Sequence, residues 1–350
     1  MNHLPIYGIG LMCGTSHDGL DIACVEFDRN EHGWVYNLIE SNEIPLSESL
    51  KQSLDDSTKS SGLQLAKLDA DFARFSAEQV NIFCEKYQIA PEFIASHGVT
   101  IFHDPRVGIT TQIGSGAIIS ALTQTTTISD FRTQDVAKGG NGAPLVPFAD
   151  SLLFSEFDYS LNLGGFANVS ALRKDALIGF DIAPCNLLLN HIANKIGLNH
   201  DEGGELARMG TLIDPLLHSL NKLPYYEQKP PKSLGYEWFE DQILPIIPNE
   251  SPADLLHTAC EHIAIQIGKS LHSHGSCIVT GGGAFNDYLI ERIRHYVNCD
   301  IVIPDPQIIR FKEAICFAFL GLLRLRQEKN ISSTVTGATS DSIAGAIYIP

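Results

Sequence analysis

Basic residues are scarce in this chain. Its 350 residues include 24 Lys and Arg against 41 Asp and Glu, which gives a formal net charge of −17 at pH 7. Proteins that bind nucleic acids or anionic membranes generally need basic surface to neutralise phosphate groups. The composition therefore argues against a nucleic-acid partner and against a membrane partner. Backbone amides can still bind an anion at a single site.

Long apolar runs and paired cysteines are also missing. No segment approaches the ~20 apolar residues of a membrane-spanning helix, and the N-terminus lacks the charged and apolar regions of a secretion signal. The 8 cysteines are scattered, with no Cys-x-x-Cys pair and no zinc-ligand spacing. We therefore expect reduced thiols and a cytoplasmic location. The hydrophobic content of 44% is enough for a large core, and the length favours two domains.

An order of three strands followed by a helix is predicted twice. The expected strands are 7–12, 20–27 and 34–44 before a helix at 63–87, and then 159–163, 167–172 and 177–181 before a helix at 186–196. This repetition indicates two similar α/β halves with a cleft between them. We expect a first domain over residues 1–131, to which 335–350 return, and a second over 132–334. The Gly-rich stretch 132–143 is a candidate hinge.

The N-terminal glycine-rich segment is the clearest candidate phosphate site. An apolar run ends at the sequence Gly14-Thr15-Ser16-His17-Asp18-Gly19-Leu20-Asp21, and a second apolar run follows. The pattern predicts a hairpin. In its turn, the Thr15 and Ser16 hydroxyls would donate to phosphate oxygens, and Asp18 or Asp21 would hold a hydrated Mg²⁺. The alternative is an ordinary tight turn, since Asp-Gly is common in hairpins.

Two further glycine clusters follow predicted strands. The run Gly281-Gly282-Gly283-Ala284 lies between an apolar segment and a helical pattern, which predicts a strand, a turn and a helix. Such a turn lets a base and ribose lie against bare backbone, and tight packing of the helix on its strand is the alternative. The pair Gly164-Gly165 predicts a second hydrogen-bonding turn. Neither a Gly-x-Gly-x-x-Gly fingerprint nor a Walker A lysine is present, so dinucleotide dehydrogenases and P-loop enzymes are not supported.

Asp181 is the carboxylate that we predict to be catalytic. It ends the apolar run 177–180 and precedes Pro184 and a predicted helix. We expect it to project from the carboxyl edge of its strand into the cleft. The alternative is an N-cap, because Asp before a helix commonly caps it.

Three other polar residues are candidates for contacts with a substrate. Ser96 and His97 follow an apolar run, and His97 either orients a substrate hydroxyl or is a structural histidine. Glu313 begins a predicted apolar helix that ends at Leu323. Facing inward, it would need a polar ligand, whereas facing outward it would complement the helix dipole.

Residues 10–21 resemble the signature opening of the anhydro-N-acetylmuramic acid kinases, which usually have Ser at the position of Cys13. The resemblance continues through blocks at 96–100, 111–114, 130–132, 135–137, 139–147, 162–168, 230–233, 280–284 and 312–314. It implies two RNase H-like domains of the actin-like ATPase fold closing over ATP.

The resemblance also implies a reaction. Water opens the 1,6-anhydro bridge of the sugar and the γ-phosphoryl group of ATP passes to O6, which yields N-acetylmuramic acid 6-phosphate and ADP in peptidoglycan recycling. Asp181 matches the base that deprotonates the water. The implied nucleotide contacts are residues 14–21, Gly164, Gly165 and 281–284, and the implied sugar contacts are Ser96, His97, Asn168 and Glu313. ATP with Mg²⁺, an amino-sugar substrate and a homodimer complete these expectations.

One block departs from the family pattern. The family usually follows its catalytic Asp with Thr-Gly-Pro-Gly-Asn, whereas residues 182–186 here are Ile-Ala-Pro-Cys-Asn, and Asn190 replaces a usual Asp. Two alternatives therefore accompany the main prediction. One is a kinase for a related free amino sugar or hexose, in which Asp181 deprotonates the acceptor hydroxyl. The other is a catalytically silent ATP- or sugar-binding regulator.

Overall fold

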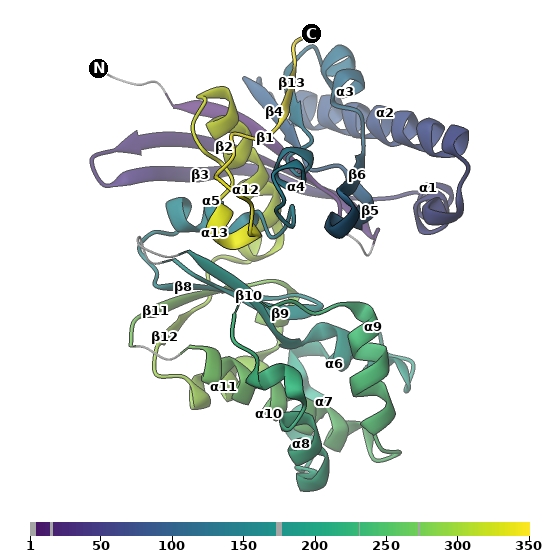
Figure 1. Ribbon diagram of the computed structural model, residues 1–350, viewed down its shortest axis with the longest axis vertical. Helices are drawn as coiled ribbons and strands as arrows, with labels where there is room; N and C mark the ends of the chain where they lie inside the picture. The colour runs from purple at the N-terminus through teal and green to yellow at the C-terminus, as the bar shows by residue number, and fades with distance from the viewer. Residues whose placement is uncertain (1–4, 15–16, 173–176, 231, 272–273) are drawn as a thin grey trace. The chain divides into compact units, whose positions relative to one another are not determined.

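The computed structural model describes residues 5–14, 17–172, 177–230, 232–271 and 274–350. The chain divides into two compact units (Figure 1), which are Met1–Leu153 with Phe311–Pro350 (unit 1) and Phe154–Arg310 (unit 2). The boundaries predicted from the sequence are 131/132 and 334/335 instead. The segments 132–153 and 311–334 belong to unit 1.

Unit 1 is built on a six-stranded sheet in the order β13-β7-β4-β1-β2-β3. Its strands are β1 (Ile6–Met12), β2 (Gly19–Asn30), β3 (Gly33–Pro45), β4 (Phe93–Ser96), β7 (Thr126–Ser129) and β13 (Ala346–Tyr348). β1, β2 and β3 form an antiparallel meander, whereas β4 runs parallel to β1 and β7 runs parallel to β4. A separate hairpin joins β5 (Val99–Asp104) to β6 (Ile109–Ile113).

Helices cover both faces of this sheet. On one face, Leu11 and Ile22 share a core with Phe72 of α2 (Gly62–Tyr87). On the other face lies α12 (Pro306–Leu325), so close to β1 that a Cβ on Gly10 would collide with the Ala314 carbonyl. The remaining helices of the unit are α1 (Glu48–Asp55), α3 (Gly116–Thr123), α4 (Thr133–Ala137), α5 (Val146–Leu153) and α13 (Ser333–Thr336), with single 3₁₀ turns η1 (Ser57–Lys59) and η2 (Pro105–Val107).

Unit 2 is built on a five-stranded sheet in the order β10-β9-β8-β11-β12. Its strands are β8 (Tyr159–Leu163), β9 (Phe166–Ala171), β10 (Ile178–Pro184), β11 (Ser276–Thr280) and β12 (Asp300–Val302). β8, β9 and β10 form an antiparallel meander, and β11 and β12 run parallel to β8. When the strands of each sheet are counted along the chain, both sheets place them side by side in the order third, second, first, fourth, fifth, and unit 1 adds β13 beyond the fifth. The prediction of two RNase H-like α/β domains is therefore confirmed. The predicted cleft concerns the placement of the units and stays a prediction.

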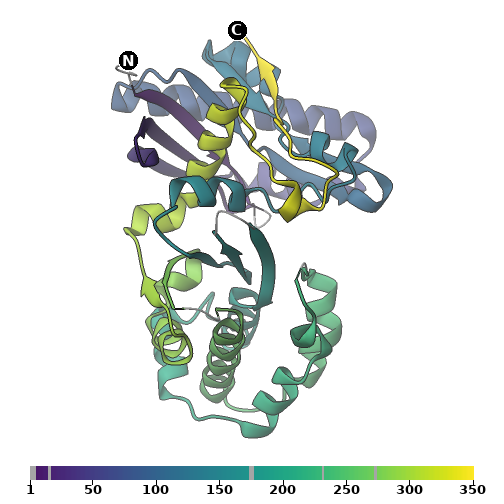
Figure 2. The same cartoon turned by 60° about the vertical axis from the view of Figure 1, so that its left-hand side comes forward.

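The helices of unit 2 form one core with its sheet and gather on one side of it (Figure 2). They are α6 (Asn186–Asn194), α7 (Glu205–Met209), α8 (Asp214–Asn221), α9 (Tyr236–Trp238), α10 (Pro252–Ser270) and α11 (Asp287–Tyr296). The short turns are η3 (Glu202–Gly204), η4 (Pro224–Glu227), η5 (Phe239–Ile243), η6 (Leu244–Ile246) and η7 (Gly282–Phe285). α10 supplies much of the core, including Leu256 and Ile263, which are both fully buried.

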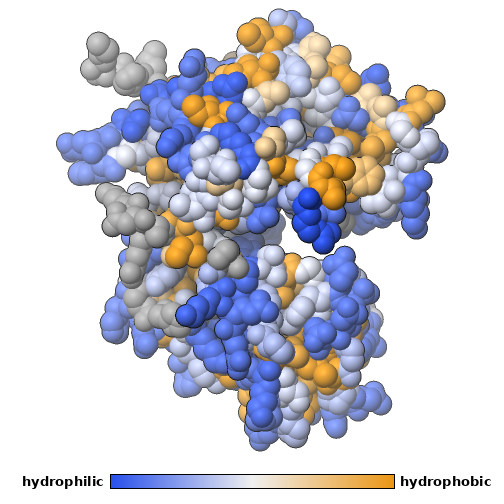
Figure 3. Space-filling view, in the orientation of Figure 1, coloured by the Kyte–Doolittle hydropathy of each residue, from blue (hydrophilic) through white to orange (hydrophobic). Residues whose placement is uncertain are grey.

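The visible surface is mostly hydrophilic. On the face that Figure 3 shows, hydrophilic residues predominate and hydrophobic ones lie in small groups. Within the described ranges, no helix has both the length and the apolar character that crossing a membrane requires.

Candidate active site

The N-terminal segment forms the predicted hairpin. β1 and β2 are antiparallel, with Met12 opposite Asp21, so the described residues 13, 14, 17 and 18 lie between the two strands. Within this turn the His17 N–H donates to the Gly14 carbonyl (3.2 Å), and His17 adopts the left-handed conformation at φ 52°. Thr15 and Ser16, the predicted phosphate donors, lie outside the described residues.

Two polar side chains of this turn have partners on α1. His17 Nδ1 lies 2.8 Å from an Asp55 carboxylate oxygen, and Lys51 donates to Asp18 over 3.1 Å. Asp18 and Lys51 are both exposed, so their ion pair contributes little to stability. These contacts fix the C-terminal side of the turn. The phosphate and Mg²⁺ contacts assigned to residues 14–19 stay predictions.

Asp21 lies among other carboxylates in unit 1. It stands opposite Glu43 of β3, and paired residues of neighbouring strands project from the same face of a sheet. Burial, Glu43 and Glu313 together raise the pKa of Asp21 to about 7. A cation bound here would relieve that repulsion, and Mg²⁺ needs only one or two protein carboxylates because it keeps several waters. No group of three or more His, Cys, Asp or Glu residues in the described ranges is arranged to hold a metal by itself.

Glu313 does not begin its helix, so that prediction was wrong. The helix α12 starts at Pro306, which is seven residues or about two turns before Glu313. Glu313 therefore lies beyond the first turn, where the helix dipole acts weakly. The protein packed around it raises the pKa of Glu313, against the opposing charges of Lys312 and Arg132. The residue nevertheless keeps solvent-exposed surface.

His97 binds a partly buried arginine, Arg132. Its Nδ1 lies 2.9 Å from the Gly98 carbonyl, and Arg132 donates from Nη2 to the other ring nitrogen over 2.8 Å. Burial and the nearby Arg132 lower the pKa of His97 to about 3, so the ring is neutral. Both ring nitrogens therefore have protein partners, which supports the structural interpretation. Ser96, at the end of β4, is also buried. The sugar contacts of Ser96 and His97 stay predictions.

Asp181 lies within a strand and not at its end. β10 continues past Asp181 to Pro184, and the pairing with β9 shifts between Asp181 and Ala183. Such a bulge is common beside active sites, where it redirects a side chain. The prediction that Asp181 ends its strand was therefore wrong. The N-cap alternative is also wrong, since the residue that caps α6 is Cys185, with no side-chain hydrogen bond.

Asp181 belongs to a row of polar residues across four strands. Asp181 stands opposite Asn168, Asn168 opposite Asn162, and Asn162 beside Thr280. The residues that alternate with them, such as Leu161 and Val169, lie in the core, so the row occupies the other face of the sheet. The Thr280 hydroxyl is buried and has no hydrogen-bond partner in the described part of the chain.

Residues 225–234, which are distant from Asp181 in sequence, form hydrogen bonds with its side chain and its backbone. The Leu234 N–H donates to Asp181 Oδ2 (2.9 Å), and the Tyr225 hydroxyl donates to the Asp181 carbonyl (2.6 Å). The Asp181 N–H in turn donates to the Lys232 carbonyl (3.3 Å). Burial raises the pKa of Asp181, and the hydrogen bond from Leu234 opposes that rise. The Leu234 donor could not be found from the sequence, because a backbone N–H leaves no pattern there.

The two glycine turns lie close together through α6. Gly164 and Gly165 connect β8 to β9, and the Gly165 carbonyl accepts the N–H groups of Cys185 and Leu187 at the start of α6. Gly281 has φ +80°, and a Cβ there would collide with the Asn162 side chain. Close packing therefore explains part of this glycine run, as the alternative stated. The nucleotide contacts of 164–165 and 281–284 stay predictions.

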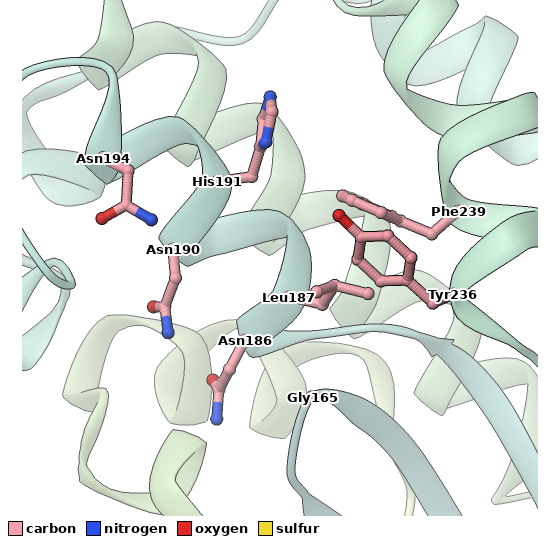
Figure 4. A pocket seen from close by; sticks show the side chains of 8 residues that line it. All are labelled: Gly165, Asn186, Leu187, Asn190, His191, Asn194, Tyr236 and Phe239. Carbon is pink, nitrogen blue, oxygen red and sulfur yellow. The ribbon is translucent and has the colours of Figure 1, made fainter. Parts of the chain in front are cut away.

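A pocket of about 370 Å³ opens beside α6 (Figure 4). It is lined by Gly165, Asn186, Leu187, Asn190, His191, Asn194, Tyr236 and Phe239. The asparagines recur every four residues along α6, a spacing that puts them on one helix face. That spacing is a sequence signal that could have identified the α6 side of the pocket. Tyr236 and Phe239, on its other side, come from a later segment of the chain.

Comparisons with known proteins identify the family of this chain. The family model described as anhydro-N-acetylmuramic acid kinase matches residues 6–350. An anhydro-N-acetylmuramic acid kinase of Francisella tularensis subsp. novicida is 34% identical over 97% of this chain and 98% of its own length. One of Pseudomonas fluorescens is 35% identical over the same shares. Component A of the (R)-2-hydroxyglutaryl-CoA dehydratase of Acidaminococcus fermentans is similar in structure, with a TM-score of 0.46 and 11% identity over 89% of this chain and 96% of that one. The chain belongs to the anhydro-N-acetylmuramic acid kinase family.

Proposed function

We propose that this protein uses ATP to phosphorylate 1,6-anhydro-N-acetylmuramic acid at O6 while water opens the anhydro bridge. The products are N-acetylmuramic acid 6-phosphate and ADP. The observation that supports this most directly is the environment of Asp181, a largely buried carboxylate with Oδ2 fixed by the Leu234 N–H. A carboxylate that is positioned in this way is suited to general base catalysis.

The reaction assigns a defined proton transfer to Asp181. The ionised carboxylate accepts a proton from the water as that water attacks the anomeric carbon. The bond from this carbon to O6 breaks, and O6 takes the γ-phosphoryl group as the bond to ADP breaks. Oδ1 is the oxygen left for the water, because the Leu234 N–H occupies Oδ2.

Backbone amides and carboxylates would bind the nucleotide. The turn at 14–19 and the Gly164-Gly165 hairpin supply amide groups of the kind that bind phosphate oxygens. Asp21, with Asp18 as the second candidate, would hold Mg²⁺, and the raised pKa of Asp21 among Glu43 and Glu313 fits a site that a cation stabilises. When bound, Mg²⁺ neutralises charge on the phosphates.

The departure at 182–185 lies in the core. Ile182, Ala183 and Cys185 are each at most 2% exposed. The substituted side chains are therefore packed against apolar neighbours, away from the polar row that contains Asp181. This location favours retained chemistry over the free-sugar kinase and the silent regulator.

An assay of ADP release separates the three functions. We expect turnover with 1,6-anhydro-N-acetylmuramic acid and ATP, and ¹⁸O from labelled water at the anomeric carbon of the product. Turnover with free hexoses or hexosamines alone would show the free-sugar kinase instead. ATP or sugar binding without any turnover would show the regulator.

The hydrogen bond from Leu234 gives a pH-dependent prediction. Leu234→Pro removes the N–H that donates to Asp181 Oδ2, so the pKa of Asp181 should rise further. The base works only when ionised, and activity is lost as the pH falls through its pKa. We therefore expect the acidic limb of the kcat/KM profile to move to higher pH.

Leu234→Ala is the matched control, because it keeps the N–H and shortens the same side chain. Its acidic limb should coincide with that of the wild type. Equal acidic limbs in the Pro and Ala variants would contradict the role of this hydrogen bond. A loss of rate at every pH without a shift would indicate only a displaced loop.

We also propose that the enzyme is a cytoplasmic homodimer that serves peptidoglycan recycling. All 8 cysteines are free thiols, which suits a reducing compartment. Light scattering after size-exclusion chromatography measures the oligomeric state, and a monomer mass at micromolar concentration would contradict the dimer.

A further inference from the structure

The backbone of Asp181 is bound from outside its sheet. β10 is the edge strand, and its pairing with β9 shifts between Asp181 and Ala183. Within a strand, the N–H and the carbonyl of one residue point to the same side. The Asp181 N–H donates to the Lys232 carbonyl (3.3 Å), and the Asp181 carbonyl accepts from the Tyr225 hydroxyl (2.6 Å). The position of this main chain therefore depends on the segment between α8 and α9 (Figure 1).

Tyr225 contributes a side chain to these contacts, whereas Lys232 and Leu234 contribute backbone groups. Its hydrogen bond of 2.6 Å is shorter than the bond with Leu234 (2.9 Å) and the bond with Lys232 (3.3 Å). Burial and the nearby Asp181 raise the pKa of Tyr225, so its hydroxyl keeps the proton near neutral pH and remains a donor. Because the donor is a side chain, a substitution can remove it without changing the backbone.

Packing fixes the Tyr225 ring. The residue is 4% exposed, and its ring centroid lies 5.3 Å from that of Trp238. The Lys232 ammonium lies 4.4 Å from the ring centroid and donates to the Tyr225 carbonyl (3.2 Å). A ring that is enclosed in this way cannot turn its hydroxyl away without displacing its neighbours. The donor to Asp181 is therefore held in place by the fold of unit 2 itself.

The adjacent Tyr226 has a different partner. Its hydroxyl lies 2.9 Å from His262 Nε2 of α10, and the other ring nitrogen of His262 lies 2.8 Å from Asn221 Oδ1. Because that oxygen can only accept, Nδ1 carries the hydrogen and Nε2 accepts from Tyr226. Burial lowers the pKa of His262 to about 3, so the ring is neutral. Tyr226 thus anchors the segment to the core helix α10, whereas Tyr225 reaches Asp181.

We propose that Tyr225 is a positioning residue for the general base, because its hydroxyl fixes the Asp181 main chain and thereby directs Oδ1 toward the attacking water. This inference rests on the proposed function, which makes Asp181 the base. A base must lie within hydrogen-bond reach of the proton that it takes, and a small displacement of a reacting group lowers the rate steeply. Loss of the Tyr225 hydroxyl should therefore slow the chemical step and leave the binding of both substrates nearly unchanged.

Tyr225→Phe tests this role, because it removes the hydroxyl and keeps the ring against Trp238. We expect kcat for 1,6-anhydro-N-acetylmuramic acid to fall by about 5-fold to 10-fold, the range of one hydrogen bond between neutral groups. The KM values for the sugar and for ATP should stay within about 2-fold of the wild type, roughly the scatter of substitutions that remove no important contact. An unchanged kcat, or a loss that lies only in KM, would overturn the proposal.

Tyr226→Phe is the matched control, because it removes the neighbouring hydroxyl. This change leaves the buried His262 Nε2 without its donor, so the melting temperature should fall at least as far as that of Tyr225→Phe. The kcat of Tyr226→Phe should nevertheless stay within about 2-fold of the wild type. Equal losses of kcat in the two variants would show that Tyr225 acts only through the stability of the segment, and the positioning role would be refuted.

The Asp181→Asn background gives a second readout. A positioning residue has no base to position once the carboxylate is gone, so Tyr225→Phe should lower the residual kcat of Asp181→Asn by less than about 2-fold. Loss of the same factor in both backgrounds would overturn the proposal, because a structural role affects both equally. If Asp181→Asn keeps the wild-type rate, the proposed function fails and the inference fails with it. If Asp181→Asn loses the rate and Tyr225→Phe does not, only the inference fails.

Discussion

Asp181→Asn should lower kcat by a factor of about 10² to 10⁴, the usual contribution of a general base. The amide has nearly the same shape as the carboxylate and keeps an oxygen that can accept the Leu234 N–H, so the local geometry should survive. What it loses is the ability to take a proton from water. The KM for ATP should change little, because the loss affects the chemical step.

The rate is measured by ADP release at saturating sugar, with a thermal melt of the same preparation. Asp305→Asn is the control, because Asp305 is an exposed carboxylate of the same unit, two residues before Gln307, whose N–H it accepts. Retention of the wild-type rate by Asp181→Asn would refute the general-base role. A loss of rate that accompanies a much lower melting temperature would point to a structural role.

The local elements could be predicted because each rests on a short pattern. The helix expected at 63–87 is α2, Gly62–Tyr87, and the strand expected at 159–163 is β8 with the same bounds. Alternation of apolar residues and the turn residues between them specify such segments. The same signals were misleading at β10, where Pro184 was taken to lie beyond the strand. β10 is an edge strand, and proline is tolerated there because no neighbour needs its missing N–H.

The partners of the candidate site could not be predicted, because they come from distant parts of the chain. Leu234 binds Asp181 across 53 residues, and Arg132 binds His97 across 35. The first uses a backbone N–H that every residue except proline carries. The second depends on how two loops meet in the folded unit. Residue type therefore indicated the candidate base, and only the fold indicates what holds it.

A buried ion pair in unit 1 gives the second large effect. Lys312 Nζ lies 2.8 Å from an Asp150 carboxylate oxygen, and the two side chains are only 6% and 3% exposed. The pair links α12 to α5, and Cys316 also contacts the Asp150 carboxylate (3.6 Å). Removal of one partner leaves the other charge buried without its counterion, which is more destabilising than loss of an exposed pair.

Lys312→Met should therefore lower the free energy of unfolding of unit 1 by about 3 to 5 kcal/mol. The methionine fills a similar volume, so the loss comes from the isolated Asp150 carboxylate more than from a cavity. Urea unfolding followed by the fluorescence of Trp34 measures this change, because that ring packs 5.3 Å from Phe319 of α12. A Trp238→Phe background removes the signal of the other tryptophan, since the chain has 2.

The double variant Lys312→Met with Asp150→Leu distinguishes the buried charge from the loss of packing. Apolar replacements of both partners are often neutral or stabilising, so the double variant should recover most of the stability that Lys312→Met loses. If the double variant is instead less stable than Lys312→Met by a further large step, the two side chains stabilise the unit through separate contacts. In that case the ion pair is not what joins α12 to α5.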